Sequence, residues 1–196
     1  GDSILITILF SLPCAVGMAV LAEPVLTLVY QNTNAASTLG ILGYAVVFVS
    51  AVMVTNAILQ SIGKERIPVF NMIIGGVIKV IVNNWLVKNP DININGAPIG
   101  TNACYIVILL LNIIWIRKEL NIKFSVMNYI VKPVISVGAM AAAALAVYRC
   151  TMQLGNTISL FLSIICGGMV YVIMIFAVGA VNEDILTTIP GMKKII

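Results

Sequence analysis

The chain has 196 residues, of which 61% are hydrophobic and 9% are charged, with a formal net charge of +4. An ordinary soluble domain is about 45–50% apolar and about 25% charged. The 11 basic and 7 acidic residues cannot cover the surface of so apolar a chain, which excludes a water-soluble fold. The expected fold class is all-α, a polytopic membrane helix bundle, because a membrane barrel would show shorter segments of alternating hydropathy.

Six apolar runs are long enough for a helix to cross a bilayer, which takes about 20 residues. They cover residues 4–22, 36–62, 68–87, 97–116, 130–148 and 157–181. The first run has no basic residues before it, and Glu23-Pro24 stands where a signal peptide would have small residues, so we interpret it as a span. Because the chain begins without Met and almost directly in apolar sequence, we expect further helices upstream in a longer protein.

The segments after the first two spans carry their own signals. Residues 23–30 are amphiphilic, and we expect them at the outer interface with Tyr30 as an aromatic anchor. Span two ends at Gly63, and a short charged turn leads into span three. The short turn and the small pair Gly75-Gly76 predict that spans two and three pack as a close antiparallel hairpin.

Small residues also recur in the last two spans. Gly138, Ala142 and Ala146 stand at every fourth position of span five, an arrangement that lets helices approach closely. Span six carries Gly167-Gly168 near its centre, and residues 182–196 are expected along the cytoplasmic interface. These features predict close helix packing in this part of the bundle.

The basic residues predict the orientation. With six spans, the side shared by both termini holds eight of them, and the opposite loops hold only Lys88 and Arg149. Because Lys- and Arg-rich short loops stay in the cytoplasm, both ends of the chain are expected to be cytoplasmic. The eight are Lys64, Arg66, Arg117, Lys118, Lys123, Lys132, Lys193 and Lys194.

Lys79 is the most informative residue, since it lies about halfway along span three. A charge there costs at least about 2.5–3.5 kcal/mol. Asn71, Gly75, Lys79 and Asn83 follow at fourfold spacing and therefore share one helical face. Lys79 either snorkels or bonds to nearby carbonyls, or it faces a hydrated cavity and meets an anionic group of a substrate.

Polar residues on two other spans could lie near this polar face of span three. Span two offers Asn56 and Gln60, and span four offers Thr101, Tyr105 and Asn112. Hydrogen bonds between helices are one explanation. The alternative is a transport cavity lined by these side chains together with Asn71, Lys79 and Asn83.

Sequence motifs for catalysis are missing. The chain shows no phosphate-binding glycine-rich loop, no nucleophile paired with a base and no paired carboxylates, so we do not expect an enzyme. Four widely separated cysteines without any histidine predict neither a metal site nor a cofactor; they are Cys14, Cys104, Cys150 and Cys166. The positive charge is explained by topology and by attraction to anionic lipid, not by nucleic acid.

Several motifs point to a family. The sequence NAILQSIGK at 56–64, then Pro68, Gly75-Gly76, NGAPIGT at 95–101 and the earlier LAEPVLTLVY at 21–30 resemble the multidrug/oligosaccharidyl-lipid/polysaccharide exporter superfamily. The likeness is greatest to polysaccharide biosynthesis and stage V sporulation protein B-like membrane proteins. It extends to about Arg117, and the last two spans match only in hydropathy.

The resemblance implies a C-terminal portion of a two-lobe transporter that works by alternating access. Residues 1–125 would then be four helices of the C-terminal lobe, and residues 126–196 the last two helices and the tail. The implied function is flipping a lipid-linked oligosaccharide or peptidoglycan precursor across the bacterial cytoplasmic membrane. Its partners would be membrane lipid, the lipid-linked sugar and the missing N-terminal helices. A cation-coupled multidrug exporter and a non-transporting membrane scaffold remain alternatives.

Overall fold

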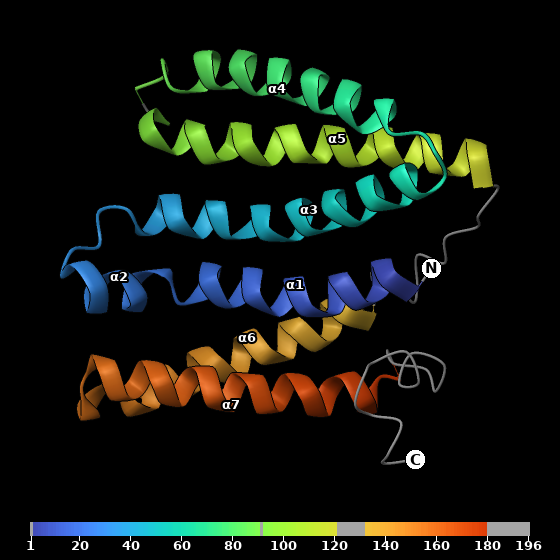
Figure 1. Ribbon diagram of the computed structural model, residues 1–196. Helices are drawn as coiled ribbons and strands as arrows, with labels where there is room; N and C mark the ends of the chain where they lie inside the picture. The colour runs from blue at the N-terminus through green and yellow to red at the C-terminus, as the bar shows by residue number, and fades with distance from the viewer. Residues whose placement is uncertain (1, 91, 121–131, 180–196) are drawn as a thin grey trace. The chain divides into compact units, whose positions relative to one another are not determined.

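The computed structural model describes residues 2–90, 92–120 and 132–179, and within these ranges all regular structure is helical (Figure 1). The predicted all-α class is thereby confirmed. In chain order the elements are α1 (Asp2–Val20), α2 (Ala22–Tyr30), α3 (Ala36–Ser61), α4 (Arg66–Leu86), the short 3-10 turn η1 (Asn93–Asn95), α5 (Gly96–Leu120), α6 (Lys132–Thr151), the 3-10 turn η3 (Met152–Leu154) and α7 (Asn156–Ala177).

Five helices in the described part are long and apolar enough to cross a membrane, namely α3, α4, α5 with η1, α6 and α7. A sixth span results if α1 and α2 are counted together, although the chain bends by 68° between them. The prediction of about six spans is confirmed. The first residues of span five, the last two of span six and the tail at 182–196 fall wholly or partly outside the described residues.

The amphiphilic segment predicted after span one is the separate helix α2. Ala22, Pro24 and Leu26 in its first half are buried, while Val29 and Tyr30 at its C-terminal end are exposed. Its interfacial position stays a prediction.

The chain divides into two compact units, and the boundary falls inside α1 after Pro13. Cys14–Lys123 form what we call the central unit, and Gly1–Pro13 together with Phe124–Ile196 form the terminal unit. The predicted division into 1–125 and 126–196 concerns lobes of a transporter and stays a prediction.

Within the central unit, α5 lies between α3 and α4 and packs along both (Figure 1). The two outer helices contact each other little, although a short turn joins them. The predicted close hairpin of spans two and three is therefore wrong. A short turn fixes which helix ends are adjacent, but it does not decide which helix faces pack.

Glycine explains why α4 packs on α5. A Cβ atom at Gly75 would lie 2.5 Å from Cγ1 of Ile108 and 3.2 Å from the carbonyl oxygen of Cys104, both in α5. The bare glycine thus lets the two backbones approach. At the neighbouring Gly76, an added Cβ would meet nothing within 4 Å.

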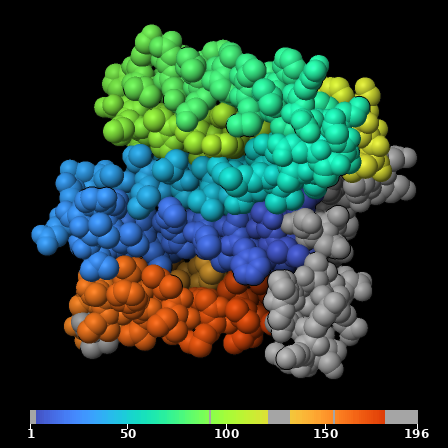
Figure 2. All heavy atoms as spheres, viewed as in Figure 1, coloured from blue at the N-terminus to red at the C-terminus, as the bar shows by residue number. Residues whose placement is uncertain are grey.

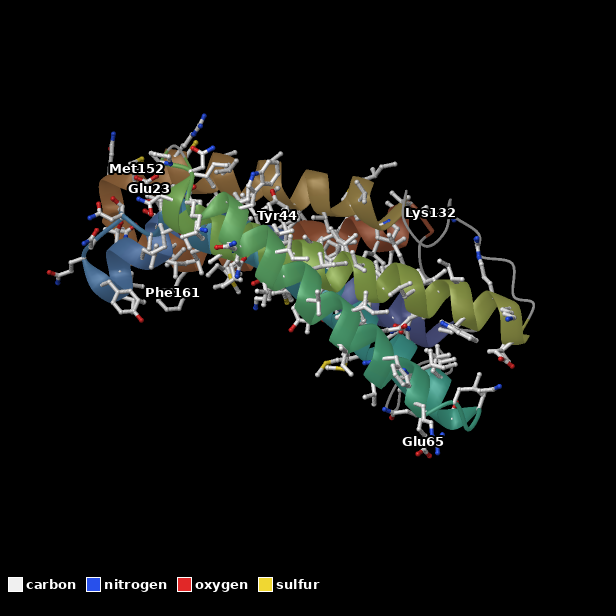
Figure 3. The ribbon with its side chains drawn as sticks, turned by 90° about the horizontal axis from the view of Figure 1, so that it is seen from above. Glu23, Tyr44, Glu65, Lys132, Met152 and Phe161 are labelled. Carbon is white, nitrogen blue, oxygen red and sulfur yellow. The ribbon has the colours of Figure 1, made fainter. Side chains whose placement is uncertain are left out.

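The α3–α4 turn is closed by a glycine at positive φ, as the sequence predicts. Gly63 has φ of 74°, and the amide of Lys64 donates to the carbonyl of Leu59 at 2.9 Å. This is the Schellman arrangement that ends helices. Lys64 also forms an ion pair of 3.1 Å with Glu119 near the end of α5, so the turn is tied to α5. Glu65, labelled in Figure 3, marks the same turn.

In the terminal unit, α6 and α7 pack closely through small and polar residues. Ser136, Ser159 and Ser163 are fully buried, and each donates its hydroxyl to a backbone carbonyl one turn earlier, so none brings an unpaired group into the contact. A Cβ at Gly167 of α7 would lie 3.2 Å from that of Ala144 in α6. Small residues and satisfied hydroxyls are typical of helix contacts in membranes.

The small residues predicted to pack span five are on another face. Gly138, Ala142 and Ala146 are exposed in the described structure. The face of α6 that contacts α7 instead carries Met140 and Ala144. This buried face mixes the small residues Ser136 and Ala144 with the larger Val137 and Met140, so fourfold spacing of small residues does not identify it. Gly138, Ala142 and Ala146 therefore do not form the α6–α7 contact, and close packing of another helix on their face stays a prediction.

Gly75 and Gly76 provide a matched test of the α4–α5 contact. Alanine favours a helix over glycine by about 1 kcal/mol, so Gly76→Ala should be neutral or stabilising. Gly75→Ala should destabilise by about 1–3 kcal/mol, because the methyl group overpacks against the buried Ile108. The measurement is the unfolding midpoint of each variant in detergent micelles. Equal midpoints would show that α4 does not approach α5 at Gly75.

Candidate functional site

A cluster of four polar side chains joins α3, α4 and α5. It consists of Thr55, Asn56, Asn71 and Asn112, and we call it the asparagine junction. The side-chain Nδ2 atom of Asn71 donates to the Oδ1 atom of Asn112 at 2.8 Å. The Nδ2 atom of Asn112 donates to Thr55 Oγ1 at 2.9 Å and to Asn56 Oδ1 at 2.7 Å. One side chain of α5 thereby bonds to both outer helices.

Burial makes these bonds important. Asn112 is 0% exposed, Thr55 1% and Asn71 3%. Thr55 in turn donates its hydroxyl to the carbonyl oxygens of Ala51 and Val52, at 2.9 and 3.0 Å. An unpaired polar group in an apolar surrounding costs several kcal/mol, so the junction stabilises the helix arrangement only because its members bond to one another.

The polar stripe predicted on span three lies on the side of α4 that faces α5. Asn71 bonds to Asn112, Gly75 packs on Ile108, and Asn83 lies against Gly100 of α5. The fourfold spacing thus indicated one helical face correctly. The transport cavity lined by this stripe stays a prediction.

Lys79 is half-buried on the same stripe. Its backbone carbonyl would lie 3.4 Å from a Cβ at Gly100, which places this part of α4 close to α5. Its ammonium group makes no hydrogen bond or ion pair with the described residues. A cation at membrane depth needs water, a carbonyl or an anion to compensate it.

Asn83 and Gly100 form a second close contact between α4 and α5. The Oδ1 atom of Asn83 is buried and accepts no ordinary hydrogen bond from the described residues. It lies where a Cβ would stand if Gly100 had one, so the Cα–H of Gly100 points at this oxygen. Contacts of the Cα–H···O kind recur between closely packed helices and contribute about 0.5–1 kcal/mol.

The remaining predicted site residues do not join the junction. Gln60 is exposed near the end of α3, and Thr101 donates its hydroxyl to the carbonyl of Ala97 in its own helix. Tyr105 packs against an apolar cluster of Val52, Cys104 and Ile108. Of the eight candidates, the structure therefore brings together Asn56, Asn71 and Asn112.

Four side chains in the contact of α3 with η1 and α5 were not predicted. Thr55 belongs to the junction, Thr38 donates to Asn95 Oδ1 at 2.7 Å, and Asn102 donates to the carbonyl of Ile41 at 2.9 Å. Asn95 and Asn102 are seven residues apart and thus lie on one helical face, a spacing that could have indicated this contact. Thr55 gave no signal, since threonine is common in apolar helices.

The described residues contain no group of three or more His, Cys, Asp or Glu side chains that could hold a metal ion. The four cysteines are not paired with each other, and Cys14 and Cys150 are exposed.

At the charged end of α5, Lys118 stacks over the ring of Trp115, with Nζ 5.2 Å from its centroid. This contact and the Lys64–Glu119 ion pair fix the end of the central unit.

Together, the apolar helices and their hydrogen-bonded polar interior define a multi-pass α-helical membrane protein. No family model and no solved structure matches the chain. A match does occur to the lipid II flippase MurJ of Bacillus subtilis (strain 168), with 26% identity over 203 aligned positions. It covers 96% of this chain, and the chain spans 37% of that relative's length. The predicted resemblance to lipid-linked sugar flippases is thereby confirmed.

The junction makes a prediction about stability. Asn112→Leu keeps the number and branching of the side-chain heavy atoms but leaves the Nδ2 group of Asn71 and the Oδ1 atom of Asn56 without their partner. We expect a loss of about 1–3 kcal/mol in the free energy of unfolding. The measurement is unfolding of the purified protein in mixed micelles of increasing sodium dodecyl sulfate.

The matched control is Asn84→Leu, because Asn84 is exposed on α4. It should leave the midpoint unchanged or raise it. If Asn112→Leu behaves like the control, the amide bonds do not hold the three helices together.

Proposed function

We propose that this chain is part of a flippase that moves a lipid-linked cell wall precursor across the bacterial cytoplasmic membrane. The observation that carries the proposal is the match to a lipid II flippase along 96% of the chain. The arrangement of apolar helices around few polar groups is consistent with it. On this proposal, the chain contributes to transport and not to catalysis.

The proposed transporter needs helices beyond this chain, because the chain matches only part of the relative. Because the chain spans 37% of the relative's length, the complete transporter would include helices outside this chain. Two lobes rocking around a central cavity would alternate access to the substrate, with both ends of this chain in the cytoplasm. The partners would be the membrane lipid, the lipid-linked sugar and those further helices.

Lys79 is the residue that we propose for contact with the substrate. A lipid-linked precursor carries an anionic phosphate linkage, and a half-buried ammonium group at membrane depth would attract it. A cation-coupled drug exporter would instead use an intramembrane carboxylate, and the acidic residues of the described helices lie at or near helix ends. Lys79 therefore favours the anionic substrate over the drug.

The asparagine junction favours a packing role, and not a cavity-lining role, for its own residues. The side-chain amides of Asn71 and Asn112 are buried and hydrogen-bonded to neighbouring helices, as is usual for residues that pack helices together. Of the predicted cavity residues, Lys79 is therefore the one whose role distinguishes transport from packing.

The test is complementation of cells depleted of the full-length protein. On the proposal, Lys79→Met should abolish growth without loss of membrane-inserted protein, because an apolar side chain cannot attract a phosphate. Lys79→Arg should retain part of the activity, since it keeps the charge. Lys88→Met, at an exposed site past the end of α4, should leave growth unchanged.

The opposite pattern would identify a packing role. If Lys79 only snorkels, Met relieves the cost of burying the charge, and the variant should be at least as stable and equally active. Full growth with Lys79→Met at normal membrane abundance would therefore contradict the proposed contact.

A further inference from the structure

The outer face of α4 has no protein partner among the described residues of the central unit. It carries Phe70, Ile73, Val77, Ile81 and Trp85, which recur at helical spacing and are between 55% and 78% exposed. In Figure 2 the side chains of α4 cover an outer edge of the central unit. This face accounts for much of the exposed apolar surface of that helix.

The two faces of α4 differ in kind. The face toward α5 holds Asn71, Gly75, Lys79 and Asn83, whereas the outer face holds large branched and aromatic side chains. Helix contacts inside membranes use small and polar residues, because lipid is as apolar as leucine and gives no hydrophobic driving force. Asn84, near the C-terminal end of the helix, is the exposed polar side chain of this face, and the rest of the face is bulky and apolar. Such a face is poorly suited to receive another helix.

The ends of the face also match a bilayer. The helix has 21 residues, and at about 1.5 Å per residue it spans about 30 Å, the thickness of the hydrocarbon core. Trp85 lies one residue before its end, where aromatic side chains occupy the headgroup region. Arg66 begins it, and Lys64 lies close by, so phosphate headgroups find positive charge there.

We propose that the outer face of α4 is in direct contact with the acyl chains of bilayer lipid. Trp85 lies at one headgroup region and Arg66 at the other. The further helices of the longer protein then dock elsewhere on this chain. The inference concerns which surface meets lipid and does not depend on the transported substrate.

The test is site-directed spin labelling of the full-length protein in vesicles of phosphatidylethanolamine and phosphatidylglycerol. Single cysteines are placed by Ile73→Cys, Val77→Cys and Ile81→Cys in a background without native cysteines, and Lys88→Cys is the water-exposed control. Collisions of each nitroxide with oxygen, which partitions into lipid, are compared with collisions with a water-soluble nickel chelate. We expect the ratio of oxygen to nickel collisions to be several-fold higher at the three α4 sites than at residue 88.

Each other outcome would overturn the proposal. Low collision rates with both reagents would show that protein covers the face, either the rest of the chain or a second copy. High nickel collision rates would show that it lines an aqueous cavity. If the cysteine-free protein does not fold, quenching of Trp85 by lipids with brominated chains replaces the labels, with Trp115 and any other tryptophan changed to Phe. Absence of quenching would contradict the proposal in the same way.

Discussion

The central unit depends on the hydrogen bonds that the Asn112 amide makes in two directions. Its Oδ1 atom accepts from α4 and its Nδ2 atom donates to α3, so α5 must lie between these helices for the buried groups to be paired. Where no water is available, polar groups can be buried only if they find each other. The glycine contacts at Gly75 and Gly100 fit the same arrangement, because they bring α4 close enough for those bonds.

The number and approximate position of the spans could be predicted because bilayer thickness sets the length of an apolar helix. The predicted run at 36–62 and the helix Ala36–Ser61 agree closely for this reason. The neighbours of each helix could not be predicted in the same way. A short turn suggested that α3 packs on α4, but α5 carries contact residues on two sides and separates them.

Single polar residues gave partial information about the site. Asn112 stands in the apolar stretch LLLNIIW, which signals that its amide is paired, yet the sequence does not say with which helix. The fourfold spacing from Asn71 to Asn83 identified one face of α4 but not whether it meets protein or water. In α6 the fourfold spacing of Gly138, Ala142 and Ala146 marks a face of small residues, but Gly167 of α7 packs against Ala144 and Met140 on another face.

The position of α5 between α3 and α4 is the central claim, and oxidative cross-linking tests it directly. In a protein that keeps Cys104 as its only native cysteine, Val52→Cys on α3 should form a disulfide with Cys104 on α5, since both lie in one buried cluster. In a protein without native cysteines, Ala45→Cys on α3 and Val82→Cys on α4, which would be neighbours in a close hairpin, should not cross-link. Efficient cross-linking of residues 45 and 82, with none between residues 52 and 104, would contradict the account.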